Sequence, residues 1–367
     1  MNKSYYSLGL MSGTSGDGID ASLAISDGKM KLDIIDNKYE GYSKDIYEEF
    51  HELKGKIHKI EDIEKFSKEL KDLERKLTLN NSTAVEVMKD ILFKKKKEKI
   101  DLVGFHGQTI LHLPEKNFSL QLGDAKLLSQ LTNTKVIYKF RENDLKNGGQ
   151  GAPLAPIFHK LLINNKKLEL PTIILNLGGI ANITSVDKNN KISSQDIGPG
   201  NCLIDNWIRL NSKNLFFDEG GSLARSGKIN KIILNQSLEN FYDNQVSKKK
   251  SFDTRDFDLS FVRGLSLEDG AATLTEFTAD ICSKKITNGN VYVCGGGRKN
   301  NYLIERIKKK ISNKIDTIDT LGIDGDFVES QAFAYLAIRS YLNLPISFPE
   351  TTGCNNPCSG GELIGKN

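Results

Sequence analysis

The stretch that decides the fold is "GLMSGTSGDGID", which runs from Gly9 to Asp20. It begins inside "YYSLGLM" (5–11), which is short and apolar. It ends inside "GIDASLAIS" (18–26), in which apolar residues alternate from Ile19 to Ile25. Alternation with a period of two is typical of a strand that buries one face. The sequence therefore predicts two strands joined by a tight, glycine-rich loop close to residue 9.

This loop carries groups that suit a phosphate. Its hydroxyls (Ser12, Thr14, Ser15) and backbone N–H groups can surround an anion, and its glycines let a ligand approach the backbone closely. It is not a P-loop, because no "GKS" or "GKT" follows the glycines. Turn geometry alone is the alternative explanation for the glycines. The candidate phosphate-binding residues here are Gly13, Thr14, Ser15, Gly16, Asp17, Gly18, Ile19 and Asp20.

Two carboxylates in the loop suit a hydrated magnesium ion. Asp17 is the first candidate for orienting the metal through water. Asp20 is the alternative, although it can instead lie within the second strand.

The strand–glycine loop–strand unit occurs a second time. "PTIILNLGGIANITSV" places Gly178 and Gly179 between two apolar runs. A third loop follows the strand "NVYVC" and precedes a helix, and its candidate nucleotide-binding residues are Gly295, Gly296 and Gly297. The repetition predicts two similar α/β halves that clasp a nucleotide between them. We expect a first domain over 1–168, a second over 169–328, and a C-terminal helix and tail over 329–367 that pack back on the first.

Composition excludes several classes of protein. The 367 residues carry a formal net charge of +4 at pH 7, which is too mild for a nucleic-acid-binding domain. No apolar run is long enough to span a bilayer, and no signal peptide is visible. Five scattered cysteines favour a reduced, cytoplasmic compartment, and Cys354 and Cys358 lack the second pair that a zinc site needs, so their spacing supports neither disulfides nor a metal site.

Eight segments together carry a resemblance to a known family. They are "GLMSGTSGDGID", "GFHGQTI", "NGGQGAPLAP", "NLGGIANIT", "DIGPGN", "DGAATLTEFTA", "CGGGRKN" and "ESQAFAYLA", and they run in order from Gly9 to Ala337. In these eight segments the chain resembles the anhydro-N-acetylmuramic acid kinases. The resemblance implies an actin-like, sugar-kinase ATPase fold with ATP in a central cleft. It also implies that water opens the 1,6-anhydro ring of the sugar and that O6 is phosphorylated, giving N-acetylmuramic acid 6-phosphate and ADP in cell-wall (peptidoglycan) amino-sugar recycling.

The resemblance also implies a general base. Water is a poor nucleophile, so the reaction calls for a carboxylate, and the resemblance places it at Asp196 in "QDIGPGN". We expect Asp196 in a loop beyond a short strand. The alternative is that it caps the helix beginning near Asn201, but Asn201 is itself a suitable cap.

Five further residues are candidates for binding the sugar: His106, Thr109, Arg141, Asp144 and Glu329. His106 and Thr109 are expected just past a buried strand over Ile100–Phe105, where α/β proteins place ligands, although they could simply form a turn. Glu329 is expected at the start of an apolar helix, where acids also occur for helix-dipole reasons. The alternative for Asp144 is that it only shapes a loop.

Two features depart from the family pattern. Lys139 stands where many members carry an aspartate, and "KSFDTRDF" (250–257) is a divergent form of a common segment. Two other functions stay open: a kinase of a related anhydrosugar such as levoglucosan, and an actin-like or chaperone-like nucleotide switch. The sequence is compatible with a homodimer.

Overall fold

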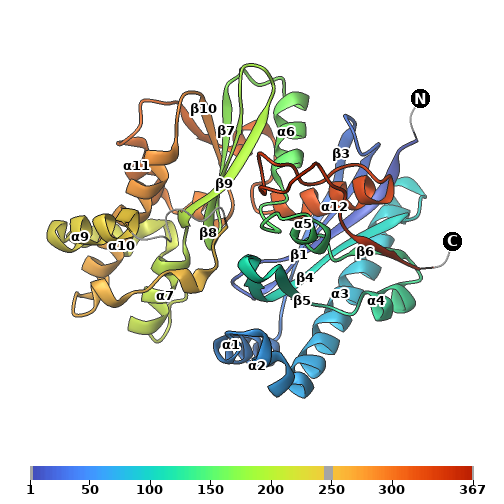
Figure 1. Cartoon of the computed structure of the whole chain (residues 1–367), viewed down its shortest axis with the longest axis horizontal. Coiled ribbons are helices and arrows are strands. Elements are labelled where there is room, and N and C mark those ends of the chain that lie inside the picture. The colour runs from blue at the N-terminus through green and yellow to red at the C-terminus, as the bar shows by residue number, and fades with distance from the viewer. Residues whose placement is uncertain (1–2, 244–250, 366–367) are drawn as a thin grey trace. The chain divides into compact units, whose positions relative to one another are not determined.

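The computed structural model describes residues 3–243 and 251–365. The chain divides into two compact units, the first made of residues 1–165 and 327–367 and the second of residues 166–326. Each unit is built around its own sheet of parallel and antiparallel strands, with helices packed against it (Figure 1). This confirms the expected α/β class.

The first unit holds the elements at both ends of the chain. Its strands are β1 (Tyr5–Ser12), β2 (Gly18–Ser26), β3 (Leu32–Gly41), β4 (Leu102–Leu113), β5 (Phe118–Leu122), β6 (Lys135–Tyr138) and β12 (Glu362–Ile364). Its helices are α1 (Lys44–Lys56), α2 (Ile60–Lys65), α3 (Ser67–Lys96), α4 (Ala125–Thr132), α5 (Glu142–Lys146), α6 (Pro156–Asn165) and α12 (Val328–Tyr341).

The second unit holds the middle of the chain. Its strands are β7 (Thr172–Leu177), β8 (Ile180–Val186), β9 (Ile192–Pro199), β10 (Asn290–Cys294) and β11 (Ile315–Thr317). Its helices are α7 (Cys202–Asn211), α8 (Ser222–Ser226), α9 (Lys231–Asp243), α10 (Leu267–Lys285) and α11 (Asn301–Lys308).

The two sheets share one topology. In the first, β1 pairs antiparallel with β2 and parallel with β4, and β3 and β6 lie outside them. In the second, β7 pairs antiparallel with β8 and parallel with β10, and β9 and β11 lie outside. The repeat predicted from the two glycine-containing hairpins is thus confirmed, and β3, which the sequence analysis did not predict, is matched by β9.

Helices cover both faces of the first sheet. Leu8 and Leu10 of β1 point into a core that includes Val85 and Met88 of α3. Successive residues of a strand face opposite sides, so Gly9 faces the other way, toward α12. A Cβ on Gly9 would lie 1.9 Å from the Ser330 carbonyl oxygen of α12. Glycine is therefore required at this position for the helix to pack directly on the strand backbone.

The second sheet has a comparable core. Apolar side chains of its strands pack against α10 and α11, with Ala279, Leu303 and Ile307 among the helix residues involved. Within the described ranges, no helix is long and apolar enough to cross a membrane.

Candidate active site

The loop between β1 and β2 is a tight turn whose shape depends on Gly16. The Gly16 N–H donates to the Gly13 carbonyl at 3.1 Å, and Gly16 has φ +61°, a conformation that L side chains rarely adopt. A Cβ there would also lie 2.3 Å from the Phe50 ring. The side chains of Thr14, Ser15 and Asp17 are exposed, whereas Ile19 is fully buried in the core. The turn therefore exposes two hydroxyls and a carboxylate, whereas Gly16 and Gly18 pack against the protein.

Neighbouring side chains hold the carbonyl groups of this loop. Gln108 of β4 donates through Nε2 to the Gly13 carbonyl at 2.8 Å. His51 and Lys54 of α1 bond the carbonyls of Ser15 and Thr14 at 2.8 and 3.3 Å. Side chains of β4 and α1 therefore bond three carbonyl groups of this loop.

The two loop carboxylates differ in setting. Asp17 is exposed and accepts a hydrogen bond from Ser15 Oγ at 2.6 Å. Asp20 lies in β2, opposite Met11 on one side and Tyr39 on the other, which is the alternative the sequence left open. The Ser12 hydroxyl is buried against the Tyr42 hydroxyl, 2.7 Å away, and its contact with an anion stays a prediction.

His106 and Arg141 lie in direct contact in the first unit. His106 Nε2 accepts hydrogen bonds from Arg141 Nε at 3.2 Å and from Nη2 at 3.0 Å, and its Nδ1 bonds the Gly107 carbonyl. Burial, together with the Arg141 charge, lowers the pKa of His106 to about 3. The imidazole is therefore neutral at physiological pH, with Nδ1–H as the donor to Gly107.

The expectation that His106 and Thr109 follow the end of a strand is wrong. Both lie within β4, which continues to Leu113 because its second half pairs with β5. The parallel pairing with β1 becomes irregular just after Leu10–Phe105, where this change of partner begins. Thr109 Oγ1 accepts from Gln121 Nε2 of β5 at 3.4 Å.

Asp144 is deeply buried, with 1% of its surface exposed. Its carboxylate accepts from Gly151 N at 2.6 Å and from Thr352 Oγ1 at 2.5 Å. Arg141 Nη1 donates to the carbonyl of the same Gly151, so Asp144 and Arg141 both fix the 147–151 loop. These contacts favour the loop-shaping alternative for Asp144. Lys139, the departure from the family pattern, pairs with Glu142 and Glu362.

Glu329 lies in the first turn of α12 and is half-buried, as expected. Phe333 and Ala337 are buried on the inner side of the same helix. Phe333 packs against the His106 ring with centroids 4.6 Å apart. The helix that carries Glu329 is thus tied to the strand that carries His106.

In the second unit, the Gly178–Gly179 turn is bonded to the start of α7. The carbonyl of Gly178 accepts from Asn201 N, and that of Gly179 accepts from Gly200 N and Cys202 N. A Cβ on Gly200 would lie 2.1 Å from the Gly178 oxygen. Asn201 occupies the N-cap position of α7 but its side chain makes no capping bond. The glycines here permit backbone-to-backbone packing.

The Gly295–Gly297 loop packs against the same region of the unit. A Cβ on Gly295 would lie 2.4 Å from Asn176 Oδ1, and one on Gly297 would lie 2.6 Å from Leu177 Cβ. Both glycine loops therefore meet at the carboxyl ends of β7 and β10, the edge at which α/β proteins bind ligands.

Gly296, the middle glycine of this loop, has a different setting. It is exposed, and a Cβ there would meet only Asn201 Nδ2, at 3.9 Å, among the residues that the structure describes. Packing within the protein therefore does not require glycine at Gly296, and the position has open space on its outer side. The loop leads into α11, which Asn300 caps by accepting from Leu303 N at 2.9 Å.

Arg298 is a residue of this loop to which the sequence analysis gave no role. Its guanidinium binds Asp319 with two hydrogen bonds of 2.7 and 3.0 Å, and it donates to Asp326 at 2.6 Å. It also donates to the Gly295 carbonyl at 3.3 Å. The bonds from Arg298 lower the pKa of Asp319. The only sequence signal was an arginine after three glycines, with three aspartates in "IDTLGIDGDF" (318–327).

Asp196 lies inside β9, so its expected place in a loop beyond a strand is wrong. It is opposite Asn182 of β8, next to an irregularity in the pairing, and 8% of its surface is exposed. Asp196 Oδ2 accepts a hydrogen bond from the backbone N–H of Phe252 at 2.9 Å. The divergent 250–257 segment therefore fixes the carboxylate; Lys250 lies outside the described residues.

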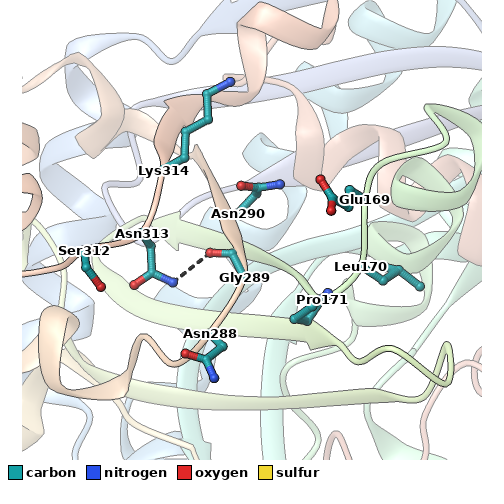
Figure 2. A pocket seen from close by; sticks show the side chains of 9 residues that line it. All are labelled: Glu169, Leu170, Pro171, Asn288, Gly289, Asn290, Ser312, Asn313 and Lys314. Atoms are coloured by element: carbon teal, nitrogen blue, oxygen red, sulfur yellow. Dashed lines mark hydrogen bonds between the residues drawn. The ribbon is translucent and has the colours of Figure 1, made fainter.

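A separate polar cavity of about 290 Å³ lies in the second unit (Figure 2). Its lining precedes three parallel strands: Glu169–Pro171 before β7, Asn288–Asn290 at the start of β10, and Ser312–Lys314 before β11. Asn313 donates to the Gly289 carbonyl across it at 2.7 Å. The cavity is thus at the amino ends of the strands, whereas the glycine loops are at the carboxyl ends, and it is no part of the candidate site.

Comparison with known proteins shows the family of the chain. The family model described as anhydro-N-acetylmuramic acid kinase matches residues 5–366. The anhydro-N-acetylmuramic acid kinase of Pelagibacter ubique (strain HTCC1062) is 50% identical over 99% of both chains, and that of Brucella canis is 37% identical over 96% of this chain and 97% of that protein. Among solved structures, the activator of the 2-hydroxyisocaproyl-CoA dehydratase from Clostridium difficile with bound ADPNP covers 91% of this chain and 94% of its own, at 13% identity and a TM-score of 0.44. By the family match and these identities, the chain belongs to the anhydro-N-acetylmuramic acid kinase family and is a kinase.

Proposed function

We propose that the chain uses ATP and Mg²⁺ to convert 1,6-anhydro-N-acetylmuramic acid and water into N-acetylmuramic acid 6-phosphate and ADP, in the recycling of cell-wall amino sugars. The family match over nearly the whole chain is the observation that carries this proposal. Membership of a kinase family also speaks against a nucleotide switch without sugar chemistry.

The first unit would hold phosphate groups and the sugar. The N–H groups and hydroxyls of the Gly13–Gly18 turn suit the charge of a triphosphate. Carbonyl groups of the same turn are already bonded by neighbouring side chains. Asp17, exposed beside Ser15, would orient Mg²⁺ through water, and the ion would neutralise phosphate charge. His106, Thr109, Arg141, Asp144 and Glu329 are the sugar-binding candidates. Of these, His106 and Arg141 are bonded to each other, so the two would act together.

The second unit would supply the base and the remaining contacts to ATP. Asp196 would take a proton from water as the water oxygen attacks the anomeric carbon. The bond from that carbon to O6 breaks, and O6 keeps the electron pair and attacks the γ-phosphorus, whose bond to the bridging oxygen breaks as ADP leaves. Phe252 N–H fixes one oxygen of Asp196, which supports a defined direction for proton transfer. The glycines that would approach ATP closely are Gly178, Gly179, Gly295, Gly296 and Gly297.

The experiment follows ADP release from the purified chain with ATP, Mg²⁺ and the anhydrosugar. We expect release to depend strictly on the sugar, and the product mass to exceed that of the substrate by both a water and a phosphoryl group. Levoglucosan in place of the amino sugar tests the related-substrate alternative. A product heavier by a phosphoryl group alone, or faster turnover of levoglucosan, would contradict the proposal.

A further inference from the structure

Three potential metal ligands far apart in sequence meet inside the first unit. Asp144 of α5 lies beside Cys354 and Cys358, which follow α12. A carboxylate oxygen and the two Sγ atoms all lie within 4.8 Å of one another. All three residues are buried, and both cysteines are free thiols. We call them the Asp144–Cys354–Cys358 cluster.

The surrounding backbone holds the cluster in place. Asp144 accepts from Gly151 N and Thr352 Oγ1, and the Cys358 backbone exchanges hydrogen bonds with Ser347, 3.1 Å from Cys358 N to the Ser347 oxygen. Ser347 Oγ also lies 3.1 Å from Cys358 Sγ. The ligand atoms are therefore positioned by contacts that do not require an ion. Such support fixes ligand direction in known metal sites.

The donor set selects for one class of metal. Thiolates favour zinc-class ions over Mg²⁺ and Ca²⁺, which prefer oxygen ligands throughout. Zn–S bonds of about 2.3 Å and Zn–O bonds of about 2.0–2.2 Å place tetrahedral ligand atoms about 3.5–3.8 Å apart, so closure needs movements of about 1 Å at most. We propose that the Asp144–Cys354–Cys358 cluster binds Zn²⁺ through three protein ligands, with water in the fourth position.

Zinc binding exchanges the two thiol protons for the metal ion. Both thiols release their protons to solvent as two Zn–S bonds form, and the Asp144 carboxylate supplies the third bond. No oxidant is needed. The bound ion would link the 142–151 segment to the C-terminal segment, two parts of the chain that the Asp144–Thr352 bond joins across 208 positions.

A disulfide is the competing chemistry for two close thiols. Both thiols are free in the structure, and zinc binding deprotonates each thiol that coordinates the ion. The experiment therefore assays for a Cys354–Cys358 disulfide as well as for zinc.

The test uses the full chain, stripped with a chelator and kept reduced. It is incubated with ZnCl₂, passed over a desalting column, and assayed for zinc by mass spectrometry. Thermal melting is recorded with and without ZnCl₂, and Co²⁺ serves as a spectroscopic probe of thiolate ligation. The variants are Cys354→Ala with Cys358→Ala, and separately Asp144→Asn. Cys282→Ala is the matched control, because it removes a buried thiol outside the cluster.

We expect the wild type and Cys282→Ala to retain about one zinc ion per chain and to melt higher with zinc. The double cysteine variant should retain none and show no cobalt–thiolate absorption. Asp144→Asn should bind zinc at least about tenfold more weakly. Complete loss of zinc from the wild type on desalting, equal retention by the double variant, or a Cys354–Cys358 disulfide in the reduced protein would each overturn the proposal.

Discussion

Replacing Asp196 by asparagine tests the proposed base most directly. The amide keeps an oxygen that can accept the Phe252 N–H now bonded at 2.9 Å, but it cannot accept a proton from water. General-base assistance is typically worth about a hundredfold to ten-thousandfold in rate. We expect a loss of that order in kcat, which corresponds to about 2.7–5.4 kcal/mol in activation free energy.

The folding cost of Asp196→Asn should be much smaller. A charged acceptor becomes a neutral one in a single backbone hydrogen bond, a difference of about 1 kcal/mol. For a unit of this size, that lowers the melting temperature by about 2–4 °C. Catalysis and stability are therefore separable, because the expected rate effect is several times larger than the effect on unfolding free energy.

The assay measures kcat, the Michaelis constants for both substrates, and thermal melting of each variant. Asp187→Asn is the matched control, since Asp187 is an exposed carboxylate at the β8–β9 turn that also accepts backbone N–H bonds. It should turn over at the wild-type rate. The reasoning is refuted if Asp196→Asn turns over at a near wild-type rate, or if its activity falls only because the protein unfolds.

Three further predictions concern the rest of the site. Thr14→Val, at an exposed position, should weaken ATP binding about tenfold by removing one hydrogen bond to a charged group while sugar affinity is kept; unchanged ATP affinity by calorimetry would contradict the phosphate role. His106, with its pKa lowered to about 3, should show no ring titration by NMR between pH 5 and 8, and a titration midpoint near 6.5 would contradict this. Because the pKa is lower in the folded state, the stability that the neutral ring contributes is lost as pH falls from about 6.5 toward 3. Arg298→Lys should lower the melting temperature at pH 7, unlike Arg225→Lys at an exposed pair, because it breaks the two-bond contact with Asp319. Because the pKa of Asp319 is lowered, the Arg298–Asp319 contact stabilises the fold above about pH 4 and is lost as pH falls further. The difference in melting temperature between Arg298→Lys and the wild type, measured by calorimetry, should therefore shrink in acid.

The local pattern of the sequence was enough to predict the hairpins and the class of fold. Alternating apolar residues on either side of a glycine turn predict two adjacent antiparallel strands, and the structure has them as β1–β2 and β7–β8. These features are governed by near neighbours in the chain, which is why an analysis of periodicity finds them.

Strand limits were decided by tertiary contacts. β4 extends through His106 and Thr109 only because β5 pairs with its second half, and β9 includes Asp196 only because β8 lies alongside. Polar and glycine residues signal a loop when considered alone. A neighbouring strand that satisfies their backbone groups keeps them extended.

The sequence by itself determined the family and the class of fold, and it predicted candidate residues for the chemistry: a phosphate loop from Gly13, a base at Asp196 and a set of sugar-binding residues. Only the tertiary structure decided which side chains meet, as Phe252 meets Asp196, Arg298 meets Asp319, and Asp144 meets Cys354 and Cys358. The reason is physical. These contacts join positions that are distant along the chain, and their formation depends on how whole strands and helices pack rather than on the preferences of neighbouring residues.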